Sequence, residues 1–180
     1  MARIEKNHFL HGISGGLGKY IIKVRNGKTY ISKRPKKPTK ESDAQRAGRE
    51  LFCQASEYAK AALQDPVLHA FYASITPKGQ NTRNVAMADF WKPPVIENIN
   101  TSSYHGNPGD TISMIVTDNG KVVSVSVCIS KDDIVLEEGN AVMQNDGVTW
   151  VYIASTQITD VDGAMVTVRA RDLAGRETVM

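Results

Sequence analysis

Two kinds of hydrophobic spacing divide the chain, and the change falls near residue 94. Between Ser42 and Trp91, apolar residues recur at intervals of three and four, which is the spacing of amphipathic helices. After Pro94 they alternate with polar residues, which is the spacing of half-buried strands. Before the helices, two β-rich stretches flank the dipeptide Asn26-Gly27. The pattern therefore predicts a β-hairpin, then about three helices, then a module of strands.

The hairpin is predicted with strands at about 18–25 and 28–34. Asn-Gly between two such stretches is a strong hairpin signal, because a type I′ turn needs positive φ at both central positions. Basic residues decorate these strands and their exit, so the hairpin is a cationic ribbon and our first candidate interaction surface. Its residues are Lys19, Lys23, Arg25, Lys28, Lys33, Arg34, Lys36 and Lys37.

Helix signals follow in the next 50 residues. Ser42 and Gln45 form a capping box at the start of a helix of about 20 residues. Its apolar stripe consists of Ala44, Ala47, Leu51, Ala55, Tyr58 and Ala62. Asp65-Pro66 supplies an N-cap and a first-turn proline for a second helix, and a third begins near Asn81-Thr82. The third helix is expected to present Val85, Ala86, Phe90 and Trp91 to the core.

The last 86 residues contain seven strand patterns separated by turn dipeptides. Four are clear, at 111–116, 122–129, 148–153 and 165–170, and three are weaker, at 95–99, 134–137 and 177–180. Short strands at this spacing predict an antiparallel β-sandwich, with Trp150 as a core anchor between its sheets. The fold class is therefore α+β.

Charge changes sign at the same place as the spacing. Residues 1–94 carry 17 Lys and Arg against 7 Asp and Glu, a net charge of +10, whereas residues 95–180 carry 5 against 12, a net charge of −7. We therefore predict a basic module at 1–92 and an acidic module at 93–180. The large groups Phe90 and Trp91, with the rigid Pro93 and Pro94, are expected to wedge the two modules together.

A glycine-rich stretch precedes the hairpin. Gly12, Gly15, Gly16 and Gly18 invite comparison with a phosphate-binding loop. Ile13 stands where such a loop needs glycine, and Tyr20 follows the lysine where it needs Ser or Thr, so the nucleotide-binding interpretation fails. Two interpretations remain: an arm that docks onto a neighbouring chain, or a flexible lead-in to the hairpin.

Candidate chemistry is sparse. The four histidines are scattered, the acidic turn Asp160–Gly163 lacks the later ligands of a calcium loop, and the two cysteines fall in different modules. Cys53 and Cys128 are expected to be small buried hydrophobes. We therefore expect no enzyme activity, cofactor or metal. No signal-peptide core or membrane span is apparent, so a soluble chain made in the cytoplasm is expected.

Two resemblances concern the architecture. The strand alternation, the aromatic strand Trp150–Tyr152 and the ending Val168–Gly175 resemble the immunoglobulin-like domains of bacterial surface and phage structural proteins. The whole chain resembles a family of uncharacterised bacterial two-module proteins. The residues that carry this second likeness are Gly12, Gly15, Gly18, Gly27-Lys28-Thr29, Pro35, Gln45, Arg46, 57–60, Asp65-Pro66, 84–90 and Pro93-Pro94. This resemblance implies the same two-module architecture, and it implies no particular activity.

The bipolar charge suggests two functions. The first is a non-enzymatic structural protein that self-associates head to tail into a filament, a ring or a phage-like particle, the basic module of one copy facing the acidic module of the next. The second is nucleic-acid binding by the basic module, since phosphate backbones attract such a ribbon.

Overall fold

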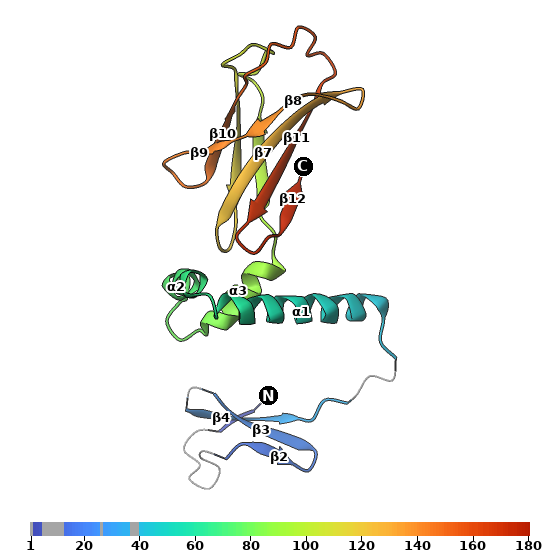
Figure 1. The fold of residues 1–180 in the computed structure, drawn as a ribbon. Coiled ribbons are helices and arrows are strands. Elements are labelled where there is room, and N and C mark those ends of the chain that lie inside the picture. Colours follow the sequence, from blue (N-terminus) through green and yellow to red (C-terminus); the bar gives the residue numbers. More distant parts are fainter. Residues whose placement is uncertain (1, 5–12, 26, 37–39) are drawn as a thin grey trace. The chain divides into compact units, whose positions relative to one another are not determined.

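The chain folds as two compact units. In a computed structural model that describes residues 2–4, 13–25, 27–36 and 40–180, the units are Met1–Asp43 and Ala44–Met180 (Figure 1). The first carries 11 Lys and Arg against 3 Asp and Glu, a net charge of +8, and the second carries 11 against 16, a net charge of −5. The three helices share the second unit with the strands that follow them. That the segments 1–92 and 93–180 fold independently stays a prediction.

The N-terminal unit is a four-stranded antiparallel sheet in the order β1-β4-β3-β2. Its strands are β1 (Ala2–Ile4), β2 (Gly15–Leu17), β3 (Tyr20–Arg25) and β4 (Lys28–Lys33). The predicted hairpin is confirmed as β3 and β4, which pair from Tyr20 opposite Lys33 to Arg25 opposite Lys28. Gly27 has a φ of 71°, as the predicted turn requires. β1 and β2 add an outer strand on each side of the hairpin.

Three helices open the second unit, and their ends follow the cap residues of the sequence. They are α1 (Asp43–Ala62), α2 (Pro66–Ile75) and α3 (Thr82–Trp91). The Asp65 side chain accepts hydrogen bonds from the backbone N–H groups of Val67 and Leu68, and the Asn81 side chain accepts one from Arg83. Each bond satisfies an amide that the first helical turn leaves without a partner. The predicted starts of α2 and α3 are therefore confirmed.

Only the second half of α1 is packed. Its buried residues are Ala55, Ala59 and Ala62, and a cluster of Ala59, Ala62, Tyr72 and Ala86 joins the three helices. Cys53 is exposed, so the prediction that it is a buried hydrophobe is wrong. Cys53 lies two residues before Ala55, about 200° around a helix with 3.6 residues per turn, and so it faces away from the cluster.

Eight strands form the rest of the second unit. One antiparallel sheet has the order β5-β6-β10-β9 and the other the order β12-β11-β7-β8. The strands are β5 (Val95–Asn100), β6 (Thr111–Thr117), β7 (Val122–Lys131), β8 (Ile134–Asn140), β9 (Val142–Met143), β10 (Thr149–Ile153), β11 (Met165–Asp172) and β12 (Glu177–Val179). Strands at all seven predicted places are therefore confirmed, and β9 is an additional short strand. With three helices and three antiparallel sheets among its described residues, the fold is α+β and rich in β-structure.

The two sheets of the second unit share one hydrophobic core. Inward-facing residues alternate along each strand, as in Ile112, Met114 and Val116 on β6 and Val125, Val127 and Ile129 on β7. Trp150 belongs to this core and is 6% exposed, which confirms its predicted role as an anchor. Cys128 lies between Val127 and Ile129 on the other face of β7 and is half-buried, not buried as expected.

A buried carboxylate ties the edge strand β8 to the segment that follows β10. Oε1 of Glu137 accepts hydrogen bonds from the backbone N–H of Ser155 (2.5 Å), the Ser155 hydroxyl (2.9 Å) and the backbone N–H of Thr156 (3.0 Å). Burial alone would raise the pKa of Glu137, but these bonds and one from Tyr152 together lower it. Glu137 is therefore held as a carboxylate that links the two sheets.

Candidate interaction surface

The N-terminal sheet has one cationic face. Directly opposite residues in an antiparallel pair project to the same side, so the strand register assigns the side chains to faces. The register places Lys23 opposite Tyr30 and Arg25 opposite Lys28. Lys23, Arg25 and Lys28 are exposed and Tyr30 is half-buried. We call these four residues, with Ile21 and Ser32 of the same face, the cationic face.

Arg34 extends this face beyond the strands. Its backbone N–H donates a hydrogen bond of 2.8 Å to the carbonyl of Lys19, which continues the pairing of β3 and β4. A Cβ atom at Gly16 would lie 2.6 Å from Nη2 of Arg34, so the guanidinium crosses β2 at the place where a side chain is missing. Gly16 is opposite Ile21, which puts the Arg34 guanidinium on the cationic face.

The opposite face of the sheet is apolar. It carries Leu17, Tyr20, Ile22, Val24, Thr29 and Ile31, and of the predicted cations Lys33 projects from it. Ile22 and Thr29 are buried, whereas Leu17, Tyr20 and Val24 are 61%, 47% and 41% exposed. Period-2 alternation therefore sorts the hairpin's residues into a charged side and an apolar side.

The remaining predicted cations and glycines lie around this sheet. Lys19 is in the turn between β2 and β3, and Lys36 is exposed beyond β4. Gly15 and Gly16 belong to β2 and pair with β3 of the same chain, and Gly18, with a φ of 53°, forms the turn to β3. Lys37 and Gly12 lie outside the described residues. Gly15–Leu17 is thus an edge strand, and any docking onto another chain would use its outer edge.

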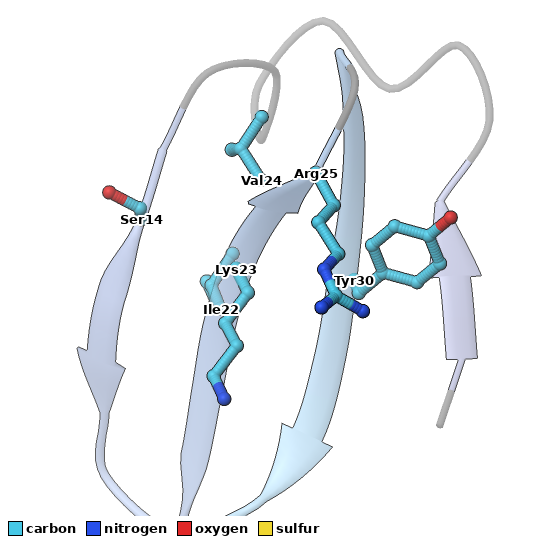
Figure 2. A pocket seen from close by; sticks show the side chains of 6 residues that line it. All are labelled: Ser14, Ile22, Lys23, Val24, Arg25 and Tyr30. Carbon is cyan, nitrogen blue, oxygen red and sulfur yellow. The ribbon is translucent and has the colours of Figure 1, made fainter. Parts of the chain in front are cut away.

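A pocket of about 620 Å³ adjoins the same sheet. Its described lining consists of Ser14, Ile22, Lys23, Val24, Arg25 and Tyr30 (Figure 2). Lys23 and Arg25 are the cations of this lining, and neither a carboxylate nor a histidine accompanies them among the described residues. The arrangement suits attraction of an anionic group.

The four residues predicted to form a wedge all lie in the second unit. Two of them, Phe90 and Pro94, contact the last strands, whereas Trp91 and Pro93 are less enclosed. Phe90 packs against Tyr58, with ring centroids 5.3 Å apart, and the Arg176 guanidinium lies 5.3 Å from its centroid. The carbonyl of the buried Pro94 accepts a hydrogen bond of 2.5 Å from the Thr178 hydroxyl. Phe90 and Pro94 therefore connect the helices to the last strands.

Trp91 and Pro93 are less enclosed. Trp91 is 40% exposed and makes an edge contact with Phe52, with centroids 6.5 Å apart, while Pro93 is half-buried. Phe52, Asn84, Met87, Ala88 and Trp91 line a shallow pocket of about 250 Å³ between α1 and α3. Trp91 is therefore part of a helical surface, separate from the contacts that Phe90 makes with the strands.

A chain of buried polar groups begins on the helices. The Tyr72 hydroxyl donates a hydrogen bond of 2.5 Å to Oδ2 of Asp89, and the Tyr58 hydroxyl lies 2.7 Å from the Tyr72 oxygen. Because the Tyr72 hydrogen is used by Asp89, Tyr58 is the donor in the second bond. Asp89 is 1% exposed. Burial raises the pKa of Tyr72 far above its usual value, and its bond to Asp89 adds to that rise.

Two further carboxyl groups reach Asp89 from the strands. Asp118, in the turn between β6 and β7, lies within hydrogen-bonding range of Asp89, and Asp172 of β11 is close enough to repel it. Burial raises the pKa of Asp89 to about 6; the bond from Tyr72 opposes the rise, and the charges of Asp118 and Asp172 add to it. We call Asp89, Asp118 and Asp172 the carboxyl cluster.

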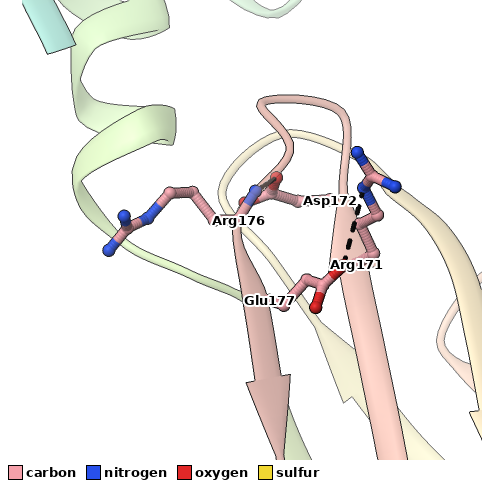
Figure 3. A network of polar contacts seen from close by, with 4 residues as sticks. All are labelled: Arg171, Asp172, Arg176 and Glu177. Carbon is pink, nitrogen blue, oxygen red and sulfur yellow. Dashed lines mark hydrogen bonds and ion pairs between the residues drawn. The ribbon is translucent and has the colours of Figure 1, made fainter. Parts of the chain in front are cut away.

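Asp172 is the last residue of β11, and Arg176 lies in the turn that leads to β12 (Figure 3). Oδ1 of Asp172 accepts a hydrogen bond of 2.7 Å from the backbone N–H of Arg176, while the Arg176 side chain extends away toward α3. Burial raises the pKa of Asp172, although that bond opposes the rise. On the neighbouring strand positions, Nε of Arg171 lies 3.9 Å from Oε1 of Glu177, both partly exposed.

Sequence reasoning missed the carboxyl cluster, although one signal was available. Asp89 follows Val85 by four residues and Ala86 by three, so it lies on the helix face that was predicted to be apolar. A carboxylate in that position needs a polar partner or a proton. The positions of Asp118 and Asp172 beside it depend on long-range packing, which no local pattern contains.

The described residues contain neither a cluster of metal ligands nor a membrane-spanning helix. Within the described part of the chain, no group of three or more His, Cys, Asp or Glu residues could hold a metal ion. Asp160, from the acidic turn, instead forms an ion pair of 2.6 Å with Nζ of Lys131. No described helix is both long and apolar enough to cross a membrane.

Comparison with known proteins adds little to this picture. No family model and no curated protein matches the chain. Among solved structures, a crystal structure of an engineered protein is similar, with 22% sequence identity and a TM-score of 0.37. The match covers 48% of this chain and 18% of the engineered one.

Proposed function

We propose that this protein is a non-enzymatic structural protein that assembles through its N-terminal unit. The observation that carries the proposal is the cationic face, which gathers Lys23, Arg25, Lys28 and Arg34 on one side of a small unit. That unit has a net charge of +8, and the unit that follows it in the chain has −5. Opposite charges on two units of every copy favour contact between unlike units of neighbouring copies.

A contact between unlike surfaces is heterologous. It leaves a free cationic face at one end and a free acidic unit at the other, so it propagates into a ring or an open filament. The acidic unit offers exposed carboxylates on its turns, among them Asp132, Asp133, Asp146 and Asp162. These are separate from the carboxyl cluster, which is enclosed between helices and strands.

The strand order supports a more specific description of the acidic unit. An immunoglobulin-like sandwich pairs strands A, B, E and D in one sheet and G, F, C and C′ in the other. Lettered in chain order from β5 to β12, with β8 as C′, the two sheets of the second unit have that order. We propose an immunoglobulin-like domain, and with it membership of the bacterial two-module family that the sequence resembles. Such domains serve as spacers and assembly modules as well as binders.

The first test is the salt dependence of assembly. The Debye screening length falls to about 3 Å at 1 M salt, so attraction between exposed charges of neighbouring copies is weakened. The average mass measured by light scattering should therefore fall as salt rises from 50 mM to 1 M. Lys23→Glu, on the cationic face, should reduce assembly at 50 mM salt by roughly tenfold, the equivalent of about 1.4 kcal/mol per contact. Lys78→Glu makes the same change of charge on an exposed loop between α2 and α3 and should leave assembly unchanged.

Two results would contradict the proposal. One is a protein that stays monomeric at 50 mM salt and high concentration. The other is equal loss of assembly in both lysine variants, because that would make net charge, and not the cationic face, the cause.

Nucleic-acid binding is a second candidate, favoured by the position of Tyr30. This aromatic ring lies opposite Lys23 on the cationic face, and cations beside an aromatic group suit single-stranded nucleic acid. If so, the full-length protein should shift a single-stranded oligonucleotide at 50 mM salt. Lys23→Glu should weaken that binding, and Lys78→Glu should preserve it. Absence of any shift at low salt would exclude this function.

A further inference from the structure

Three carboxyl groups meet where the helices contact the strands, and they have too few partners: Asp89 and Asp172 are buried, and Asp118 is half-buried. Oδ2 of Asp89 accepts from Tyr72, Oδ2 of Asp118 accepts from the backbone N–H of Gly120 (3.1 Å), and Oδ1 of Asp172 accepts from Arg176. The second oxygen of each group is buried without a hydrogen-bond partner. Buried polar atoms rarely stay unpaired, because desolvation costs about 1–3 kcal/mol for each.

Among the described residues, Arg176 is the cation that acts on the cluster. The groups that face Asp89 are Tyr58 of α1, Tyr72 of α2, Asp118 of the β6–β7 turn and Asp172 of β11. Arg176, in the β11–β12 turn, faces Asp172, but its guanidinium lies over the Phe90 ring and its Nε has no partner. Lys121, in the same turn as Asp118, is exposed. Three ionised carboxylates would therefore leave uncompensated charge inside the protein.

One proton removes most of this difficulty. A proton bound to Oδ1 of Asp89 can be donated in a hydrogen bond to Oδ1 of Asp118. This bond gives both unpaired oxygens a partner, and the proton removes one of the three negative charges. Asp89 belongs to α3 and Asp118 to the strands, so the shared proton would also join the helices to the β-sheets. Close packing holds them together at this point, since the Asp89 carboxyl lies directly against Gly120.

We propose that Asp89 and Asp118 share a proton that latches the helices onto the strands, and that loss of this proton at higher pH loosens the junction. The device goes beyond the assembly function, because it controls the inside of the second unit and involves none of the residues of the cationic face. Two contacts that involve no carboxyl group, Phe90 with Arg176 and Pro94 with Thr178, keep the opened junction tethered.

The direction of the pH dependence follows from two pKa values, that of Asp89 in the closed junction and that of an aspartate exposed to solvent. The pKa of Asp89 is about 6 in the closed junction, against 3.8 for an ordinary aspartate. A group whose pKa is raised on burial contributes its full stabilisation of the closed state at pH values below its ordinary pKa. That stabilisation is lost as pH rises through the raised value. The junction is therefore closed in acid and opens toward neutral pH.

Hydrogen exchange of two backbone amides would detect the opening. The backbone N–H of Gly120 bonds to Asp118 where the Asp89 carboxyl lies against Gly120, and the backbone N–H of Arg176 bonds to Asp172 next to the Phe90 contact. Opening removes the cover of α3 from both amides, so each is expected to lose protection. Their protection factors, corrected for the intrinsic pH dependence of exchange, should fall roughly tenfold between pH 5 and pH 7.5 in the unmodified protein. Asp89→Asn keeps an acceptor for Tyr72 and can donate to Asp118, so its protection factors should not change with pH.

Asp146→Asn is the matched control. Asp146 is exposed in the β9–β10 turn, and hydrogen bonds from Thr149 and Val148 lower its pKa, so it stays ionised across this range. This variant should show the same fall in protection factors as the unmodified protein.

If Asp89→Asn does not fold, titration of the Asp89 carboxyl carbon by NMR in the unmodified protein replaces it, with an expected midpoint near pH 6. A midpoint below about 4.5, the upper range of ordinary aspartates, would overturn the proposal. So would equal protection at both pH values, or a fall in Asp89→Asn as large as in Asp146→Asn.

Discussion

Gly120→Ala is expected to lower the free energy of unfolding by about 3 kcal/mol, at the upper end of the range for overpacked sites. A Cβ atom at position 120 would lie 2.6 Å from Cγ of Asp89 and 2.7 Å from its Oδ2. Such distances are well inside van der Waals contact, and Asp89 cannot retreat, because it is 1% exposed and bonded to Tyr72. The substitution should therefore push α3 away from the β6–β7 turn. Urea denaturation at pH 5, followed by circular dichroism, measures the loss.

Gly48→Ala is the control for this substitution. Gly48 lies within α1, and nothing comes within 4 Å of a Cβ atom placed there. Alanine in a helix interior is favoured over glycine by about 1 kcal/mol, so this variant should be slightly more stable. Equal stability of the two variants would show that Gly120 is not in close contact with the carboxyl cluster.

Trp150→Ala is expected to cost about 3–5 kcal/mol, the usual range for removing a large aromatic group from a core. Trp150 is 6% exposed and lies between the paired positions Met114 on β6 and Met143 on β9. Its indole N–H is buried without a hydrogen-bond partner, so the loss reflects packing alone. A cavity in the shared core should weaken both sheets together. The midpoint of urea denaturation at neutral pH measures it.

Ile153→Ala tests whether position in the core is the cause. Ile153 lies on the same strand as Trp150 and is 58% exposed, so its truncation should cost less than about 1 kcal/mol. A loss for Trp150→Ala no greater than for Ile153→Ala would mean that Trp150 does not anchor the core.

Local signals were sufficient for most of the secondary structure. Asn26-Gly27 predicted the hairpin of β3 and β4, because few residues tolerate the positive φ that its turn needs. Asp65-Pro66 and Asn81 predicted the starts of α2 and α3, because these side chains bond the first amides of a helix. Each of these features depends on atoms within a few residues of one another.

Features that depend on distant partners were missed or misplaced. The glycine-rich stretch has no strand pattern, yet Gly15–Leu17 pairs with β3, because a neighbouring strand edge offers its backbone hydrogen bonds. Cys53 has apolar neighbours in the sequence, yet it is exposed, because it lies on the face of α1 that points away from the buried residues Ala55, Ala59 and Ala62. Hydrophobic spacing identifies an apolar stripe but does not say how much of it another element will cover.

The sequence by itself determined the elements, their order and the separation of charge, because caps, turns and alternation act over short distances. It also determined the two faces of the hairpin, since alternate residues of a strand point to opposite sides. Only the tertiary structure decided where the compact units divide and which buried groups meet. Asp89, Asp118 and Asp172 come from separate elements, and the pKa of Asp89 is raised by its burial and by the charges of the other two. Because the interior has a low dielectric constant, the protonation state of a buried carboxyl group depends on the groups that lie beside it and not on its residue type alone.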